Sequence, residues 1–302
     1  MLSIKIKDII FNSPIIAASG TFGYGYEVKD MVDLNKIGCI ITKSITFESR
    51  EGNPQPRIHE SSSGMLNAIG LANVGVHKFC SDKLPKLNNL ETNVIISIAG
   101  SSIEEYVNIL KLIEQNNGKH IGYEINVSCP NVKKGGMEFG INSEITNKLT
   151  KALRDLTDKI LIIKLSPNVT SIEDIALSAE SGGADMISAV NTFLGTAIDY
   201  KTGKFSLSSK FGGLSGPAIK PLALARVYKI YKKVNIPIIG MGGITSFEDV
   251  IEFIRLGSTL VQMGTLNYRD PALICTFYDK IKSFIEESEF LSINELVGKF
   301  DE

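Results

Sequence analysis

The chain has 302 residues, enough for one large domain or two small ones, and its 43% apolar and 22% charged residues are ordinary for a soluble globular protein. A formal net charge of -1 gives no electrostatic reason to expect nucleic acid or an anionic membrane as a partner. No apolar run approaches the roughly 20 residues that span a bilayer, and the N-terminus lacks the apolar core of a signal peptide. We therefore expect a cytoplasmic protein.

Short apolar runs recur along the chain, and most of them are followed by helical patterns. Near-continuous apolar strands are expected where both faces of a parallel sheet are buried. Helix starts of the form Ser-x-x-Glu or Ser-x-x-Asp occur at Ser102, Ser171 and Ser246. Eight strand–helix units in about 250 residues predict an α/β fold, a (β/α)8 TIM barrel. The predicted strands are 15–19, 39–43, 94–98, 121–127, 160–165, 185–190, 236–240 and 259–263.

Three connections between the predicted strands are long. Roughly fifty residues follow the strand that ends at Lys43, and as many follow the strand that ends at Val190. With the loop at 130–142, they are rich in Gly, Pro, Ser and Asn. Because barrels of this type carry their active sites at the C-terminal ends of the strands, we expect these insertions to cover that mouth. The first residues alternate like further strands, and no linker divides the chain, so we expect one domain over 1–302.

Polar residues follow nearly every predicted strand. A lone lysine in this position usually leaves the core for solvent, but two lysines and several amides at one mouth predict a binding site. The glycine-containing turns after the last two strands expose backbone N–H groups where barrels often hold a phosphate, although each turn alone is explained by tight chain reversal. The residues and turns are Ser19, Lys43, Ser97, Asn126, Lys164, Asn191, Gly242-Gly243 and Gly264-Thr265.

Several familiar sites are missing from the sequence. No Gly-x-Gly-x-x-Gly fingerprint follows an early strand and no Walker loop occurs, which favours a mononucleotide with a single phosphate over a dinucleotide. Cys39, Cys80, Cys129 and Cys275 are far apart, without metal or iron–sulfur spacing, and the three histidines also lack metal-ligand spacing. We therefore predict no metal site within this chain.

The segment Asn126-Val127-Ser128-Cys129-Pro130-Asn131 places a thiol between two carboxamides where a predicted strand ends. Pro130 removes this stretch from regular structure. Such a cluster suits a planar, polar substrate and a cysteine acid or base. The alternative is a buried structural cysteine beside turn-forming asparagines, since free cysteine is among the most buried residue types.

Eight motifs along the chain resemble one family, dihydroorotate dehydrogenase, in that family's order from about residue 1 to residue 300. The similarity of 65–71, 133–136 and 192–195 is greatest to the NAD-linked class 1B catalytic subunit. The membrane-bound, quinone-linked class has a similar barrel with an N-terminal extension and a serine base, and we expect neither here. The motifs are Ser-Gly-Thr-Phe-Gly (19–23), Thr-Lys-Ser (42–44), Gly-Asn-Pro-Gln-Pro-Arg (52–57), Met-Leu-Asn-Ala-Ile-Gly-Leu (65–71), Asn-Val-Ser-Cys-Pro-Asn-Val-Lys (126–133), Lys-Leu-Ser-Pro-Asn (164–168), Gly-Gly-Leu-Ser-Gly-Pro (212–217) and Ile-Gly-Met-Gly-Gly-Ile (239–244).

The resemblance implies FMN across the barrel mouth. Lys164 would be the cation near the pyrimidine edge of the flavin. Ser97 departs from the family, because class 1B members often have Asn there. The implied cofactor contacts are Ser19, Lys43, Ser44, Asn126, Lys164, Val190 and Gly216, with the phosphate at Gly242, Gly243, Gly264 and Thr265. The implied substrate contacts are Lys43, Asn67, Ala68, Ile69, Gly70, Leu71, Asn126, Asn131, Asn191 and Thr192.

The reaction implied by the resemblance is the oxidation of dihydroorotate to orotate in de novo pyrimidine biosynthesis. A hydride would leave C6 for FMN, while Cys129 would take the C5 proton as general base. Lys43 would balance the substrate carboxylate or ring oxygens. Class 1B enzymes form a relay, so the resemblance also implies a homodimer core and an electron-transfer subunit that carries FAD and a 2Fe–2S cluster and reduces NAD.

Three alternatives remain open on sequence alone. The first is the fumarate-dependent, homodimeric class 1A of the same family. The second is a Schiff-base aldolase on the same barrel, with Lys43 or Lys164 as the nucleophile. The third is a non-catalytic barrel that binds a phosphorylated ligand.

Overall fold

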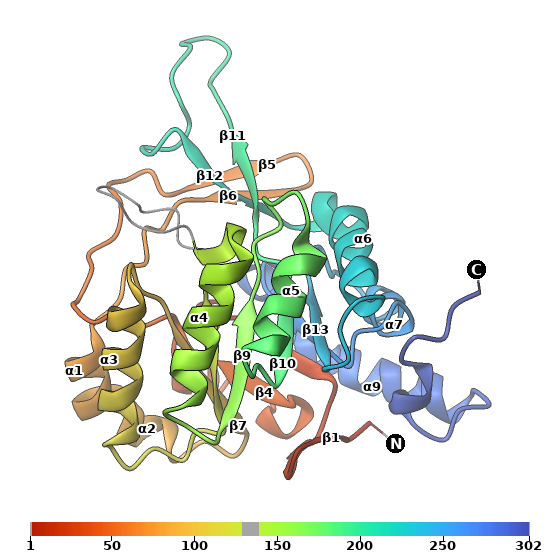
Figure 1. The fold of residues 1–302 in the computed structure, drawn as a ribbon. Coiled ribbons are helices and arrows are strands. Elements are labelled where there is room, and N and C mark those ends of the chain that lie inside the picture. The colour runs from red at the N-terminus through yellow and green to blue at the C-terminus, as the bar shows by residue number, and fades with distance from the viewer. Residues whose placement is uncertain (1, 129–138, 302) are drawn as a thin grey trace.

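The chain forms a closed barrel of eight parallel strands, as the spacing of its apolar runs predicts (Figure 1). The computed structural model describes residues 2–128 and 139–301. Neighbouring strands pair in chain order, and the barrel closes where β14 pairs with β3, with Val261 opposite Ile15. All eight predicted strands are present. The barrel strands are β3 (Ile15–Ala17), β4 (Cys39–Ile41), β7 (Asn93–Ile98), β8 (Gly122–Asn126), β9 (Ile160–Lys164), β10 (Met186–Ala189), β13 (Ile238–Met241) and β14 (Leu260–Met263).

Helices cover the outer face of the barrel, which explains why its strands are mostly apolar (Figure 1). Every residue of β9, for example, is buried. The longer helices carry the apolar stripe that this packing requires, such as Ile109 and Ile113 in α3. The helices in the described ranges are α1 (Val76–Lys78), α2 (Leu84–Leu87), α3 (Ile103–Glu114), α4 (Ser143–Arg154), α5 (Ile172–Ser181), α6 (Lys220–Tyr231), α7 (Phe247–Arg255), α8 (Leu266–Arg269) and α9 (Leu273–Glu286).

The three helix starts predicted from serine spacing are all present, but they differ in detail. Ser102 accepts a hydrogen bond from the backbone N–H of Glu105, and Ser246 forms a complete capping box with Asp249. The hydroxyl of Ser171 instead donates to the carboxylate of Asp174 at 2.7 Å and makes no backbone cap bond. None of the helices in the two described ranges is long and apolar enough to cross a membrane.

A short antiparallel hairpin, β1 (Ile4–Ile6) and β2 (Ile9–Phe11), lies at the end of the barrel opposite the long insertions (Figure 1). Ile4 pairs with Phe11, and both side chains are buried in the core. The alternation that predicts a strand at the N-terminus is therefore explained by a hairpin with one buried face.

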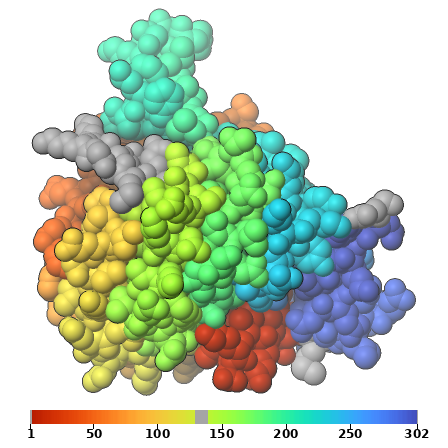
Figure 2. Space-filling view, viewed as in Figure 1, coloured from red at the N-terminus to blue at the C-terminus, as the bar shows by residue number. Residues whose placement is uncertain are grey.

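The two fifty-residue insertions meet above the other end of the barrel in one antiparallel sheet, ordered β11–β12–β6–β5 (Figure 1). The first insertion supplies β5 (Ile58–Ser61) and β6 (Gly64–Asn67), and the second supplies β11 (Phe193–Thr196) and β12 (Phe211–Ser215). Beyond this sheet, the connection between β11 and β12 projects from the molecule (Figure 2). Insertions over the mouth are confirmed, whereas their union in one sheet has no local signal in the sequence.

Candidate active site

Hydroxyl groups from three neighbouring barrel strands meet on one side of the mouth. The Ser19 hydroxyl donates to the carbonyl of Thr42 at 2.9 Å. Ser44 lies 3.4 Å from Ser19 and shares a 2.8 Å hydrogen bond with Ser97, which is fully buried. Ser97 therefore lies inside the barrel wall formed by β7 and contacts Ser44 there. Because it is buried, Ser97 is not one of the proposed cofactor contacts. Ser19 and Ser44 lie where the sequence places them, at the ends of β3 and β4.

Lys43 follows β4 and is half-buried at the mouth, beside Gly20. Burial lowers the pKa of Lys43, and the positive charge of Arg57 lowers it further. The Arg57 guanidinium donates to the carbonyls of Glu51, at 2.9 Å, and Asn53. A ligand carboxylate would relieve the repulsion between these two cations. In the sequence Arg57 stands out only as part of the motif 52–57, because its proximity to Lys43 depends on how the first insertion folds back.

Side-chain amides from three different elements converge on the opposite side of the mouth. Asn126 ends β8, and its Oδ1 accepts a hydrogen bond from the amide of Asn191 at 3.3 Å. Thr192, the next residue, lies against Gly213, where an added Cβ would approach the threonine Oγ1 to 2.0 Å. Asn67 in β6 donates to the carbonyl of Gly213 at 3.2 Å. The insertion sheet thus brings Asn67 towards the two barrel asparagines.

Residues 68–71 continue from Asn67 across the mouth. The backbone N–H of Ala68 donates to the carbonyl of Arg57 at 2.7 Å. Gly70 and Leu71 both have a positive φ, 73° and 56°, which is uncommon for leucine. The chain therefore turns sharply here, and the segment beginning at Asn67 lies beside Arg57.

Four backbone N–H groups at the ends of the last two barrel strands lack an acceptor within the described parts of the chain. They belong to Gly242 and Gly243 after β13 and to Gly264 and Thr265 after β14. A Cβ on Gly243 would lie 2.6 Å from the backbone nitrogen of Lys220, so this turn has no room for a side chain. Because unpaired backbone N–H groups are costly and attract anions, these turns fit a phosphate.

Val190 and Gly216 join the barrel to the insertion sheet near the turn at Gly242-Gly243. The N–H of Val190 donates to the carbonyl of Met241 at 3.0 Å. Gly216 has a φ of 98°, and an added Cβ would lie 2.6 Å from the Cα of Gly64. Their backbones therefore pass close to neighbouring segments of the protein.

Lys164 ends β9 and is 5% exposed. Its ammonium donates to the carboxylate of Glu124 at 3.2 Å. Glu124 is fully buried in β8 and is absent from the candidates found in the sequence. One signal could have found it, since it is the only charged residue in the apolar run 121–127.

The thiols of the described cysteines are poor general bases. Burial raises the pKa of Cys39 well above its usual range, and the negative charge of Glu124 adds to this. Burial also raises the pKa values of Cys80 and Cys275. Cys129 and Asn131 lie outside the described residues, so their sequence-based roles stay predictions. In the described ranges, no group of three or more His, Cys, Asp and Glu could hold a metal ion.

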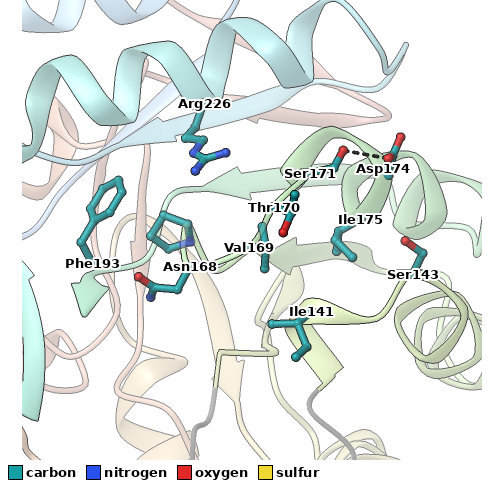
Figure 3. Close-up of a pocket in the computed structure, with 11 residues that line it drawn as sticks. Ile141, Ser143, Asn168, Val169, Thr170, Ser171, Asp174, Ile175, Phe193 and Arg226 are labelled. Atoms are coloured by element: carbon teal, nitrogen blue, oxygen red, sulfur yellow. Dashed lines mark hydrogen bonds between the residues drawn. The ribbon is translucent and has the colours of Figure 1, made fainter. Parts of the chain in front are cut away.

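A separate cavity of about 700 Å³ lies beside the mouth, between the beginning of α5 and α6. Arg226 of α6 points into it towards Asn168 and Phe193, and the Ser171–Asp174 hydrogen bond lies on its far side (Figure 3). None of the predicted cofactor or substrate residues lines this cavity. The candidate site is therefore the mouth beneath the insertion sheet and not this open cavity.

Comparisons with known proteins show the family of this chain. The family model described as dihydroorotate dehydrogenase matches residues 1–285. The chain belongs to the dihydroorotate dehydrogenase family. Its relatives include proteins named dihydroorotate dehydrogenase B (NAD(+)), catalytic subunit. Those of Phocaeicola vulgatus, Bacteroides thetaiotaomicron and Caldicellulosiruptor bescii are each 45% identical to this chain, over 301, 300 and 300 residues, covering 99% of both chains in each comparison.

Membership of the dihydroorotate dehydrogenase family gives the mouth a chemical context. Flavin-dependent chemistry is general to this family, and the residues present fit FMN in two respects. The N–H groups after β13 and β14, which lack an acceptor among the described residues, suit its single phosphate, and the buried Lys164 at the end of β9 offers a cation. The individual contacts of the described residues with cofactor and substrate stay predictions.

Proposed function

We propose that this chain is an FMN-dependent dihydroorotate dehydrogenase that oxidises dihydroorotate to orotate in pyrimidine biosynthesis. Full-length identity of 45% with NAD-linked catalytic subunits supports the reaction and the class. The single structural observation that supports the cofactor assignment is the set of four N–H groups after β13 and β14 that have no acceptor within residues 2–128 and 139–301. Neither the Schiff-base aldolase nor the non-catalytic barrel accounts for these N–H groups together with the three amides.

The residues of the mouth divide into three groups with different tasks. The turns at Gly242-Gly243 and Gly264-Thr265 hold the phosphate. Ser19, Ser44, Val190 and Gly216 border the ring system, with Lys164 at its pyrimidine edge. Bound FMN supplies the hydride acceptor that no side chain offers.

On the substrate side, Lys43 balances the carboxylate or ring oxygens of dihydroorotate, and Arg57 lies close enough to assist. Asn67, Asn126 and Asn191 pair with the imide and amide groups of the ring. The segment Ala68–Leu71, with Asn131 and Thr192, completes the substrate contacts. Cys129 takes the C5 proton as general base. The insertion sheet excludes water from the covered mouth.

Electrons leave through a partner in this proposal. The relatives are named catalytic subunits, which supports a second subunit for this chain. We propose that the subunit carries FAD and a 2Fe–2S cluster and reduces NAD, around a homodimeric core of this chain in the cytoplasm. The chain itself is one FMN-binding barrel domain over 1–302.

An anaerobic visible spectrum tests the proposal directly. The purified protein, incubated with FMN, should show a flavin band near about 450 nm that bleaches when dihydroorotate is added. A yellow protein that does not bleach would contradict the substrate. A protein that stays colourless with FMN would contradict the cofactor.

The electron acceptor needs its own experiment. We expect a second polypeptide containing iron to co-purify with this chain and to be required for NAD reduction. Rapid fumarate-dependent turnover by the chain alone would instead favour the class 1A alternative. Covalent trapping of Lys43 or Lys164 by borohydride in the presence of substrate would favour the aldolase.

A further inference from the structure

Glu124 is a fully buried carboxylate inside the barrel, and the proposed reaction does not use it. It lies in the middle of β8, two residues before Asn126 at the mouth. An ionised carboxylate in such a position is costly unless all its hydrogen bonds are supplied. Its contacts therefore indicate why it is there.

Three donors from three other barrel strands converge on Glu124. Lys164 of β9 donates to Oε1 at 3.2 Å. Ser188 of β10 and Gln262 of β14 donate to Oε2, at 3.0 Å and 2.7 Å. Gln262 also donates to the Ser188 hydroxyl at 2.7 Å, which joins the two donors to each other. Glu124 therefore accepts hydrogen bonds through both of its oxygens.

The two oxygens of Glu124 have different tasks in this network. Oε2 is held by the neutral Ser188 and Gln262, which fix the carboxylate to the interior of the barrel. Oε1 is left to the ammonium of Lys164, which has no other hydrogen-bond acceptor among the described residues. Two of the three N–H groups of Lys164 therefore remain for a ligand at the mouth.

The positive charge that Lys164 brings to the mouth is therefore partly offset by the negative charge of Glu124. A bare ammonium would strongly favour negative charge on a ligand, whereas an ammonium beside a carboxylate favours it less. In a dry interior this difference is large, because water does not screen it.

We propose that Glu124 is a positioning residue that aims Lys164 at the mouth and offsets its charge, and thereby limits how strongly the site prefers reduced over oxidised FMN. The inference rests on the proposed function for the presence of FMN at the mouth. It concerns a residue that touches neither cofactor nor substrate. Its action passes through Lys164.

The test compares the dissociation constants for oxidised and reduced FMN in Glu124→Gln. Glutamine keeps the shape of the side chain and still offers Lys164 an oxygen, but it removes the charge. The midpoint potential of bound FMN is measured with dithionite as the reductant and without dihydroorotate. Its difference from the midpoint potential of free FMN gives the ratio of the two dissociation constants. We expect the ratio to move by about tenfold or more in favour of reduced FMN.

The matched control is Glu114→Gln. Glu114 is also paired with a lysine, Lys159 at 2.6 Å, and also accepts from hydroxyls, but it ends α3 outside the barrel. We expect its ratio to equal that of the parent. A merely structural role for Glu124 would weaken the binding of both FMN forms equally and leave the ratio unchanged.

An unchanged ratio in folded Glu124→Gln, or a ratio that moves towards oxidised FMN, would overturn the inference. If Glu124→Gln does not fold, the same ratio is measured in Glu124→Asp. The shorter side chain of aspartate keeps the negative charge but moves it away from Lys164. Its ratio should move in the same direction by a smaller factor, and no movement would count against the inference. A parent protein that does not bind FMN would contradict the proposed function instead.

Discussion

The side-chain amide of Asn191 donates to Oδ1 of Asn126 at 3.3 Å, although β9 separates the strands from which the two residues emerge. Asn191 also accepts the backbone N–H of Thr192 through its Oδ1 at 2.8 Å. The two amides are therefore held in a fixed relative orientation before any ligand arrives. Such preorganisation is what a site for a planar ring with several polar edges requires.

Replacing Asn191 by alanine should impair the binding of orotate and the use of dihydroorotate. The change removes one ring contact and releases the Asn126 amide from its partner, so kcat/KM should fall by about 10- to 1000-fold. Orotate affinity can be followed through the change that it causes in the flavin spectrum. Asn147→Ala removes an amide that bonds the carbonyl of Ser178 on α5 and should leave orotate affinity unchanged.

Replacing Gly243 by alanine should abolish tight FMN binding. Its φ is 78°, and the new Cβ would meet the Lys220 nitrogen at 2.6 Å, so the phosphate-binding turn must move. Gly203→Ala is a matched control, since its φ is 67° but nothing lies within 4 Å of the added Cβ. Both variants should lose about 1 kcal/mol of stability from the positive φ, while only the first loses FMN affinity in a fluorescence titration. Equal FMN affinity in the two variants would contradict a phosphate site at this turn.

Replacing Cys129 by alanine should preserve FMN and orotate binding but remove most turnover. An unperturbed thiol has a pKa of about 8.5, so turnover by the parent should increase as the pH rises towards that value. Stopped-flow bleaching of the flavin by dihydroorotate measures this step. Cys275→Ala is the control, because Cys275 lies on α9 with its thiol at the carbonyl of Asp33. Normal bleaching by Cys129→Ala would show that the base assignment is wrong.

The stability of the protein should fall on acidification because of His120. This side chain is 4% exposed, and burial, with a smaller contribution from Lys159, lowers its pKa from 6.5 to about 4. Between these values the unfolded chain binds more protons than the folded one. The contribution of His120 is therefore fully present above pH 6.5 and is lost as the pH falls towards 4, by up to about 3 kcal/mol.

His120→Gln should flatten this part of the pH dependence of the unfolding free energy. Glutamine does not titrate and can still bond the Tyr123 hydroxyl, which lies 2.8 Å from His120 Nε2. Urea unfolding at several pH values measures the slope. His77→Gln, which changes an exposed histidine, should keep the slope of the parent. A parent slope that persists in His120→Gln would assign the acid sensitivity to other groups.

Much of the barrel is predictable because its signals are local. The run 160–163 is apolar at every position, and only a strand buried on both faces requires that. Polar residues at strand ends, including Lys43, Asn126 and Lys164, must gather at one mouth once the strands are parallel and closed. The sequence therefore determined the barrel, the end that carries the site and most of the candidate residues. The helix that follows Ser171 is present as predicted, but the Ser171 hydroxyl bonds the Asp174 carboxylate and not a backbone N–H group.

Tertiary structure alone decided which distant segments meet. Asn67 lies opposite Gly213 because β6 pairs with β12, almost 150 residues later in the chain, and strand pairing of that kind leaves no periodic signal. The surroundings of Glu124 also depend on strand pairing, because its partners Lys164, Ser188 and Gln262 come from three other strands. Sequence periodicity reports whether a residue is buried. The long-range register of the strands decides which groups it is buried with, and hence what its charge can do.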